Sequence, residues 1–500
     1  MSARVKTLLF IGLFLPSLVK ADFLFNENCI KAYQSIINLR LQEGQQLINI
    51  EKKANPKNNI PILLENYIDF FKVLTTETDA SFEKFKQNKS TRIDIIEDDP
   101  QKNSPWYLYT LAEINLQSCI NRLKYQEFVT GGYELQKAYK LLEENKRKFP
   151  NFLPNQKSFA LLYGLIGLVP EQYKWALSTI GLKGNVQEGI VMLEELKTKL
   201  PNSSYAYFQP EAIYFLSFIQ LTIENNPNIF DVVTKNTANI SNQSLLKIYI
   251  CSLVALRTGH SDEAIDLLSN RPKSAAYCDF IHLDYMLGCA KQCRFDNDAV
   301  SYFENYLKNY NGNFNIKDSY LKIAWYYLLK GNIDKYNAYT ALCKIRGSAI
   351  SEKDKAAVLL ASEVHAPEIS LLRSRLYFDG GYYKKAYDAI VDKKLESIPL
   401  TKDKVEYLFR MGRIQLALNN DEQAIIFFNA CIAKGSQLKY QYAASSSFFL
   451  GSIYEKKKQF KKAATQYELC MSLPNEEYKN SIESKAKAGL RRVTITHAPV

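Results

Sequence analysis

A small residue, an alanine and a bulky residue recur at nearly constant spacing in the last third of this chain. In each copy the alanine follows the small residue by 12 positions, and the bulky residue follows the alanine by four. Neighbouring copies are 38 and 39 residues apart. The three copies contain, in order, Ser374, Tyr377, Ala386 and Ile390; Gly412, Ala424 and Phe428; and Gly451, Tyr454, Ala463 and Tyr467.

This spacing is typical of paired helices. A small residue lets the first helix approach its partner closely, and the alanine on the second helix accepts that contact. The residue four positions later lies on the same helical face and fills the gap to the next pair. The pattern resembles the tetratricopeptide repeat, whose usual period is about 34 residues. We therefore predict an all-α, tetratricopeptide-like solenoid, a superhelix of antiparallel helix pairs.

Weaker copies extend the series toward the N-terminus. They contain Leu253, Ala255, Ala264 and Leu268 around a turn at Gly259; Leu287, Ala299 and Phe303; and Ala324, Tyr327 and Tyr336 around a turn at Gly331. A further pair is expected over 175–201, with Gly184-Asn185 as the turn, Gly189 as the small residue and Pro201 closing the second helix. One such frame would be weak support, whereas a series of six or seven favours a solenoid strongly.

Composition agrees with long helices and a large core. The chain is 47% hydrophobic and carries 33 Tyr and 27 Phe that can wedge between helices, while 16 Pro and 20 Gly leave long segments uninterrupted. Solenoid cores are continuous, so length alone does not set the number of domains. We predict a signal peptide at 1–21, an N-terminal helical cap at 22–103, helical repeats at 104–243, tetratricopeptide-like repeats at 244–490 and a tail at 491–500.

The first residues predict export. Arg4 and Lys6 precede an apolar run at 7–15, and Val19 and Ala21 are small residues at the positions that a signal peptidase reads. We expect cleavage after Ala21 and a periplasmic or envelope-associated bacterial protein. The alternative is an uncleaved N-terminal anchor. No stretch after residue 25 is apolar enough to span a membrane, so no integral span is expected once the signal is removed.

The cysteines and histidines do not predict a cofactor. Most of the nine cysteines fall within helical apolar patterns and are interpreted as small buried hydrophobes. Cys289 and Cys293 are four positions apart, a spacing that suits a metal or a disulfide, but no histidine or second cysteine pair accompanies them. The four histidines show no metal-ligand spacing, and neither a serine nucleophile elbow nor a phosphate loop occurs. We predict a protein that is not an enzyme, because the buried polar cluster that catalysis would need is not visible.

The formal net charge of +12 has two interpretations. The lysines are scattered along helices, which favours solvated helix faces. The alternative is attraction of a basic face to an anionic membrane surface. Motifs of nucleic-acid-binding folds do not occur, so no nucleic-acid partner is expected.

The segment 159–190 carries a more specific resemblance. An apolar helix with Gly164 and Gly167 ends at Pro170, and the turn Gly181-Leu182-Lys183-Gly184-Asn185 leads to Gly189-Ile190. This segment resembles the eukaryotic tetratricopeptide repeat protein 39 family and its fungal mitochondrial outer-membrane relatives, with Leu182 and Asn185 replacing a Phe and an Asp. The stretch from 104 to 154 also resembles exported bacterial relatives of the Bacteroidetes type. The resemblance implies a noncatalytic helical-repeat protein.

The repeat frame predicts a candidate binding strip. Arg375 and Arg413 each follow the small residue of adjacent repeats, so both should face the concave side, and Lys456 would extend the strip. Such a strip suits a carboxylate, an acidic peptide or a phosphate. In the alternative, Glu368 and Glu406 pair with the arginines between repeats.

Together these patterns predict an exported, noncatalytic scaffold or adaptor. Its concave groove would bind a protein or peptide partner through complementarity over several repeats. The alternative is a peripheral envelope or membrane-surface protein that uses its basic face.

Overall fold

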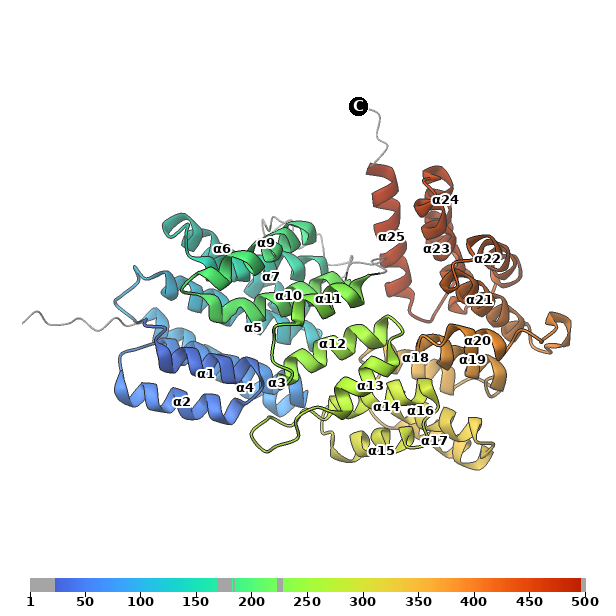
Figure 1. Ribbon diagram of the computed structural model, residues 1–500, viewed down its shortest axis with the longest axis horizontal. Coiled ribbons are helices and arrows are strands. Elements are labelled where there is room, and N and C mark those ends of the chain that lie inside the picture. Colours follow the sequence, from blue (N-terminus) through green and yellow to red (C-terminus); the bar gives the residue numbers. More distant parts are fainter. Residues whose placement is uncertain (1–22, 169–181, 183–184, 223–227, 496–500) are drawn as a thin grey trace, which may run out of the picture.

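The predicted all-α architecture is confirmed. The computed structural model describes residues 23–168, 182, 185–222 and 228–495, and these residues form helices and no strand (Figure 1). The expected signal peptide and most of the first helix expected before Gly184 lie outside the described residues. The helices of the N-terminal part are α1 Glu27–Ile37, α2 Leu41–Ala54, α3 Ile60–Thr76, α4 Asp79–Glu97, α5 Pro105–Lys124, α6 Phe128–Lys148, α7 Leu153–Leu168, α9 Val186–Lys199, α10 Gln209–Thr222 and α11 Ile229–Thr237.

The C-terminal part continues the same arrangement of paired helices. Figure 1 shows α1–α10 gathered on one side, α19–α25 on the other and α12–α17 between them. The helices are α12 Leu245–Arg257, α13 Ser261–Ser269, α14 His282–Arg294, α15 Ala299–Asn309, α16 Ile316–Leu329, α17 Ile333–Ile345, α18 Glu352–Ala361, α19 Ile369–Asp379, α20 Tyr383–Asp388, α21 Thr401–Ala417, α22 Asp421–Gly435, α23 Gln441–Lys456, α24 Phe460–Ser472 and α25 Lys479–Ile495.

Local sequence accounts for several helix boundaries. Asn26 caps α1 by accepting the backbone N–H of Cys29. The start of α5 combines a Ser104 cap with Pro105 in the first turn, where a missing N–H costs nothing. The predicted turns at Gly259 and Gly331 have φ of +73° and +76°, a conformation that glycine adopts without a steric penalty.

The small residues of the repeat frame are needed because the bulky residue of the same pair packs onto them. A Cβ added to Gly412 would lie 2.6 Å from the Phe428 ring, and one added to Gly451 would lie 2.6 Å from the Tyr467 ring. Tyr467 also packs against Gly489 of α25, so this aromatic does reach the following helix. In the first copy, Ser374 Oγ donates a 2.8 Å hydrogen bond to the Ala386 carbonyl.

The superhelix turns tightly enough for two distant repeats to touch. The α12–α13 turn at Gly259 meets the α19–α20 turn at Gly381, and the two backbones are so close that no side chain would fit at Gly381. Tyr382 Oη donates to Asp262 Oδ1 at 3.0 Å across the same junction. Helices α13–α19 therefore form the part of the chain that lies between the two contacting turns.

The N-terminal helices also contact the middle of the chain. Tyr310 Oη donates to Glu77 Oε2 at 2.5 Å, and the Cys278 N–H donates to the Leu39 carbonyl at 2.9 Å. The region expected as a cap consists of α1–α4, which pack on one another and on α5. At the other end, α25 runs to Ile495, past the position at which a tail was expected to begin.

The pair expected over 175–201 is described only in its second helix. Asn185 caps α9 by accepting the Glu188 N–H at 2.9 Å. Gly189 packs on α7, since an added Cβ would lie 2.8 Å from the Ala160 carbonyl oxygen. Pro201 lies in the short 3-10 turn that ends α9, as predicted.

Candidate functional site

Two cavities meet on the inner side of the C-terminal repeats. The larger, about 810 Å³, is lined by residues of α12, α14, α16, α18, α19 and α21, and we call it the chamber. The smaller, about 330 Å³, runs over α19, α21, α23 and α25, and we call it the groove. Both cavities are lined by Arg375, Asp379, Arg413, Phe449 and Tyr478. The walls come mainly from the first helix of successive pairs, which is the face that the repeat frame assigns to the concave side.

Arg413 is an arginine held by aromatic rings alone. Its guanidinium carbon lies 4.5 Å from the centre of the Phe378 ring and 4.4 Å from that of Phe449. Within the part of the chain that the structure describes, this guanidinium has neither a hydrogen-bond acceptor nor an ion-pair partner. Burial lowers the pKa of Arg413 to about 10. The side chain is thus charged at neutral pH, and its charge is not neutralised by a salt bridge.

Arg375 lies beside it with a weak partner. Its guanidinium carbon is 4.8 Å from the Trp325 ring centre, and its Nε is 3.8 Å from Asp379 Oδ2. Burial alone would lower the pKa of Arg375, but Tyr478 and Asp379 hold that pKa above its usual value.

Lys456 lies apart from the two arginines. Its Nζ pairs with Asp421 Oδ2 at 3.3 Å, its side chain is 67% exposed, and it lines neither the chamber nor the groove. The structure therefore brings together Arg375 and Arg413, two of the three predicted site residues, and leaves Lys456 apart.

The alternative in which Glu368 and Glu406 pair with these arginines holds only in part: neither forms an ion pair with Arg375 or Arg413 among the described residues, but Glu406 and Arg375 interact electrostatically across the repeats. Glu368 pairs with Lys393 at 3.0 Å and caps α19 by accepting the Leu371 N–H at 2.8 Å. Glu406 accepts from Arg410 Nε at 2.8 Å within its own helix. Helix-capping geometry and the i, i+4 spacing offered both carboxylates closer partners than the neighbouring repeat did.

The chamber carries more positive than negative charge. Its cationic lining residues are Arg257, Lys322, Lys353, Arg375 and Arg413, and its carboxylates are Asp318 and Asp379. Asp318 pairs with Lys322 at 3.6 Å, and Asp379 is the partner of Arg375.

Three side chains that line the chamber carry a buried polar atom with no hydrogen-bond partner in the part of the chain that the structure describes. These atoms are Trp325 Nε1, Gln292 Oε1 and His282 Nδ1. Trp325 is 3% exposed, and a buried indole N–H is expected to have an acceptor.

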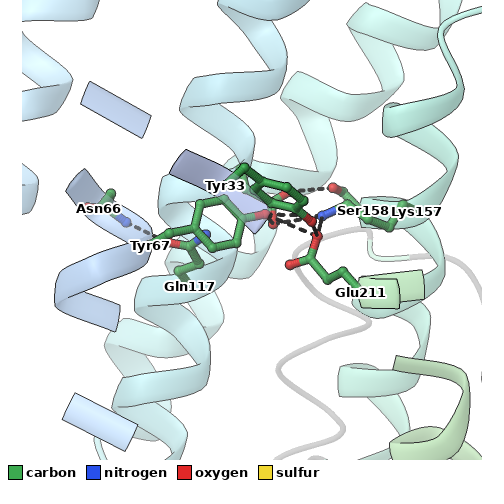
Figure 2. Close-up of polar contacts among 8 residues, drawn as sticks. Tyr33, Asn66, Tyr67, Gln117, Lys157, Ser158 and Glu211 are labelled. Atoms are coloured by element: carbon green, nitrogen blue, oxygen red, sulfur yellow. Dashed lines mark hydrogen bonds and ion pairs between the residues drawn. The ribbon is translucent and has the colours of Figure 1, made fainter. Parts of the chain in front are cut away.

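A second polar cluster lies in the N-terminal part and was not found from the sequence. Figure 2 shows its side chains converging from separate helices. Lys157 Nζ donates to Glu211 Oε2 at 2.6 Å, to Glu113 Oε1 at 3.2 Å and to Tyr67 Oη at 3.2 Å. We call this cluster the Lys157 network, and its members are Tyr33, Tyr67, Glu113, Lys157, Ser158 and Glu211.

The remaining bonds of the Lys157 network satisfy both carboxylates. Tyr33 donates to Glu211 Oε2 at 2.6 Å, while Tyr67 and Ser158 donate to Glu113 at 2.9 and 2.5 Å. The network joins α1, α3, α5, α7 and α10, whose contributing residues are up to 178 positions apart. No sequence motif marks it, because each helix contributes only one or two of its members.

The chemistry of the Lys157 network is that of a structural tie. Lys157 has an exposed fraction of 0%, and its ammonium lies 5.4 and 5.2 Å from the ring centres of Phe208 and Phe215. Burial would lower the pKa of Lys157, but Glu113 and Glu211 hold it above its usual value. Burial also raises the pKa of Glu211, and the nearby Glu113 adds to that shift. One buried ammonium faces two carboxylates, and the tyrosine and serine hydroxyls complete the hydrogen bonds of both, so the network holds five helices together.

The cysteines and the remaining acidic groups define no metal centre among residues 23–168, 185–222 and 228–495. No group of three or more His, Cys, Asp or Glu side chains is arranged there to hold a metal ion. All nine cysteines are free, and six of them are buried. Burial raises the pKa of the Cys29, Cys343 and Cys431 thiols to about 12, so these groups remain protonated. Over the same residues, no helix combines the length and apolarity required to cross a bilayer.

Comparison with known proteins supports the repeat class. Residues 406–434 and 444–477 each match the tetratricopeptide repeat family, and these segments correspond to the α21–α22 and α23–α24 pairs. Two of the helix pairs beside Arg413 are therefore tetratricopeptide repeats, a class of protein-interaction module.

Two solved structures match this chain at low similarity. The crystal structure of yeast Tom70 matches at 12% identity and a TM-score of 0.25, over 94% of this chain and 89% of that one. A human IFIT1 dimer with PPP-AAAA matches at 12% identity and a TM-score of 0.30, over 95% and 96%. TM-scores this low do not define a shared arrangement of the helices. Among curated proteins, none matches this chain.

Proposed function

We propose that this chain is a noncatalytic tetratricopeptide-repeat scaffold that binds a protein partner in the groove. The observation that carries the proposal is that α19, α21, α23 and α25 each contribute side chains to one continuous groove. Its apolar positions, such as Phe448 and Ile482, can hold partner side chains, while Arg375 and Arg413 attract acidic ones.

Affinity recovery from the native host tests this function. A tagged chain is compared with the Arg375→Glu/Arg413→Glu double variant after crosslinking. The matched control is Lys384→Glu/Lys434→Glu, which makes the same change in charge at exposed positions on the second helices of the same repeats. We expect one defined protein with the wild type and the control, and its loss with the double variant at unchanged helical circular dichroism. Equal recovery with the double variant would contradict a role for the groove.

We further propose that the mature chain is exported to the periplasm or envelope, after cleavage behind Ala21, and is a distant relative of the tetratricopeptide repeat protein 39 family. The basic and apolar character of 1–21 and the segment at 159–190 support these two points. The intact mass of the protein purified from its host tests cleavage, because retention of residues 1–21 would leave the N-terminal anchor as the explanation.

A specific observation also favours association with an anionic membrane surface. Exposed lysines cluster where α23 ends and α24 begins, at Lys456, Lys457, Lys458, Lys461 and Lys462. Sedimentation with vesicles containing anionic lipid should then fall steeply as salt rises, because screening weakens contacts between exposed charges. Sedimentation that is independent of salt would exclude this function.

A further inference from the structure

The chamber differs from a peptide groove because distant backbone closes part of its wall. Thr258 and Gly259 of the α12–α13 turn line it, as does Tyr383 at the start of α20, and these two regions meet at the contact between Gly259 and Gly381. An extended chain that followed the groove into the chamber would meet this backbone junction. The shape therefore favours a compact ligand over a continuing peptide strand.

The unpaired charge of the chamber defines the chemistry of that ligand. Lys322 and Arg375 have Asp318 and Asp379 as partners, whereas Arg257, Lys353 and Arg413 have no ion pair among the described residues. Lys353 Nζ has only the Tyr285 hydroxyl as a hydrogen-bond partner, at 3.2 Å. Three cations in one concave site leave about three positive charges unmatched. Such a site favours a ligand with more than one negative charge, since each charge-assisted contact adds to binding.

The apolar lining defines the rest of the ligand. Two cations lie close to the Trp325 ring, with Lys322 Nζ 5.5 Å and the Arg375 guanidinium carbon 4.8 Å from its centre. Phe378 and Phe449 hold Arg413 in place, so the charged groups are fixed before a ligand arrives. An apolar body against the aliphatic wall at Leu253, Met286 and Leu360, with acidic oxygens at the cations, would suit this lining.

We propose that the chamber binds a small organic anion that carries at least two negative charges and an apolar body. Its volume of about 810 Å³ lies within the range of small-molecule sites. The acidic groups are phosphate or paired carboxylates, which present the same oxygens to arginine. Binding of the anion in the chamber does not require a protein partner. It would give the repeats that form the groove a second binding site, for a small ligand.

Titration of the full-length chain with matched probes tests the proposal. The probes are naphthyl phosphate, naphthalenedicarboxylate and, as the neutral control, naphthylmethanol, with affinity measured by calorimetry at low and high salt. We expect at least one dianion to bind and its affinity to fall with salt, while the neutral probe binds at least about tenfold more weakly. The better of the two dianions distinguishes a phosphate ligand from a carboxylate ligand.

Variants locate the binding in the chamber. Arg413→Gln and Lys353→Gln should each weaken dianion binding about tenfold. Lys355→Gln is the matched control, because Lys355 lies on α18 like Lys353 but pairs with Glu352 at 3.1 Å outside the chamber. Lys353 is exposed, so its variant tests the proposal even where Arg413→Gln disturbs folding.

Three results would overturn the proposal: no binding of either dianion, equal binding of the neutral probe, or equal weakening by Lys353→Gln and Lys355→Gln. Failure here is distinguishable from failure of the scaffold function. Loss of probe binding in Lys353→Gln with unchanged capture of the partner protein would assign the two activities to separate cavities.

Discussion

The two polar clusters of this molecule place similar side chains in opposite situations. In the Lys157 network one ammonium lies between two carboxylates, with tyrosine and serine hydroxyls completing the bonds. In the chamber, three of the five cations have no carboxylate partner among the described residues, and aromatic rings flank Arg375 and Arg413. Buried charge that is matched ties a fold together, whereas charge that is held rigidly and left unmatched is available to a ligand.

The largest expected effect comes from breaking the matched cluster. Lys157→Met would leave Glu113 and Glu211 buried without their cation, and the free energy of unfolding should fall by about 3–5 kcal/mol. Urea unfolding measures this loss. Lys31→Met is the control, since Lys31 pairs with Glu27 at a site where its side chain is 55% exposed, and it should cost less than about 1 kcal/mol. A loss below 1 kcal/mol for Lys157→Met would contradict the structural role of the network.

Acid should destabilise the fold through His282, which lines the chamber. Burial lowers the pKa of His282 from 6.5 to about 4, against the opposing effect of Glu77, while Lys124 and Lys353 lower it further. The unfolded chain takes up the proton first, so the stability from neutral His282 is fully present above pH 6.5 and is lost as the pH falls toward 4. The loss should reach about 2–3 kcal/mol.

Unfolding free energies measured at several pH values check this expectation. A His282→Gln variant should show a shallower decline between neutral pH and pH 5 than the wild type, and the difference isolates this histidine from the carboxylates that titrate in the same direction. Parallel curves for the two proteins would exclude His282 as the source.

Packing within the repeats gives the next effect. Gly451→Ala places a Cβ 2.6 Å from the Tyr467 ring and should cost about 1–3 kcal/mol. Gly132→Ala is the matched change in α6, where an added Cβ meets no atom within 4 Å, and it should stabilise the fold by about 0.5–1 kcal/mol. Thermal unfolding measures whether each variant is destabilised or stabilised. Equal shifts of the two unfolding temperatures would contradict the close approach of Gly451 to the Tyr467 ring.

The smallest expected change in stability tests the comparison between the Lys157 network and the chamber most directly. Arg413→Leu removes a desolvated charge that has no carboxylate partner and keeps an apolar side chain between Phe378 and Phe449. The free energy of unfolding should stay within about 1 kcal/mol of the wild type. Dianion binding should nevertheless weaken by at least about tenfold. A loss of stability as large as that of Lys157→Met would show that Arg413 is a structural residue.

Sequence reasoning succeeded where the relevant contacts lie within one repeat or between neighbours. The small and bulky positions of each pair and the turns at Gly259 and Gly331 were identified from spacing. The contact itself differs from the prediction, because Phe428 packs on Gly412 and Tyr467 on Gly451, where the pattern predicts an alanine. The same frame placed Arg375 and Arg413 in one register, and both line the chamber and the groove. The frame misplaced Lys456. This lysine lies further beyond the small residue of its repeat than the two arginines do, so its side chain faces a different neighbour, Asp421.

The Lys157 network was beyond such reasoning. Its members come from five helices, and a lone Lys or Glu in an amphipathic helix has the same appearance whether it is solvated or buried. The aromatic residues around it, such as Phe208 and Phe215, are equally consistent with an ordinary core. Only the packing of α1, α3, α5, α7 and α10 together distinguishes the two cases.

The sequence by itself determined the helix pairs, their small and bulky contact positions and the side of each pair that carries the arginines, because these depend on residues less than about one repeat apart. Tertiary structure alone decided that Gly259 meets Gly381 and that the charges of the chamber remain unmatched. The physical reason is that the small rotation between neighbouring repeats accumulates along the superhelix. Which distant residues finally meet depends on the sum of those rotations, which no local pattern records.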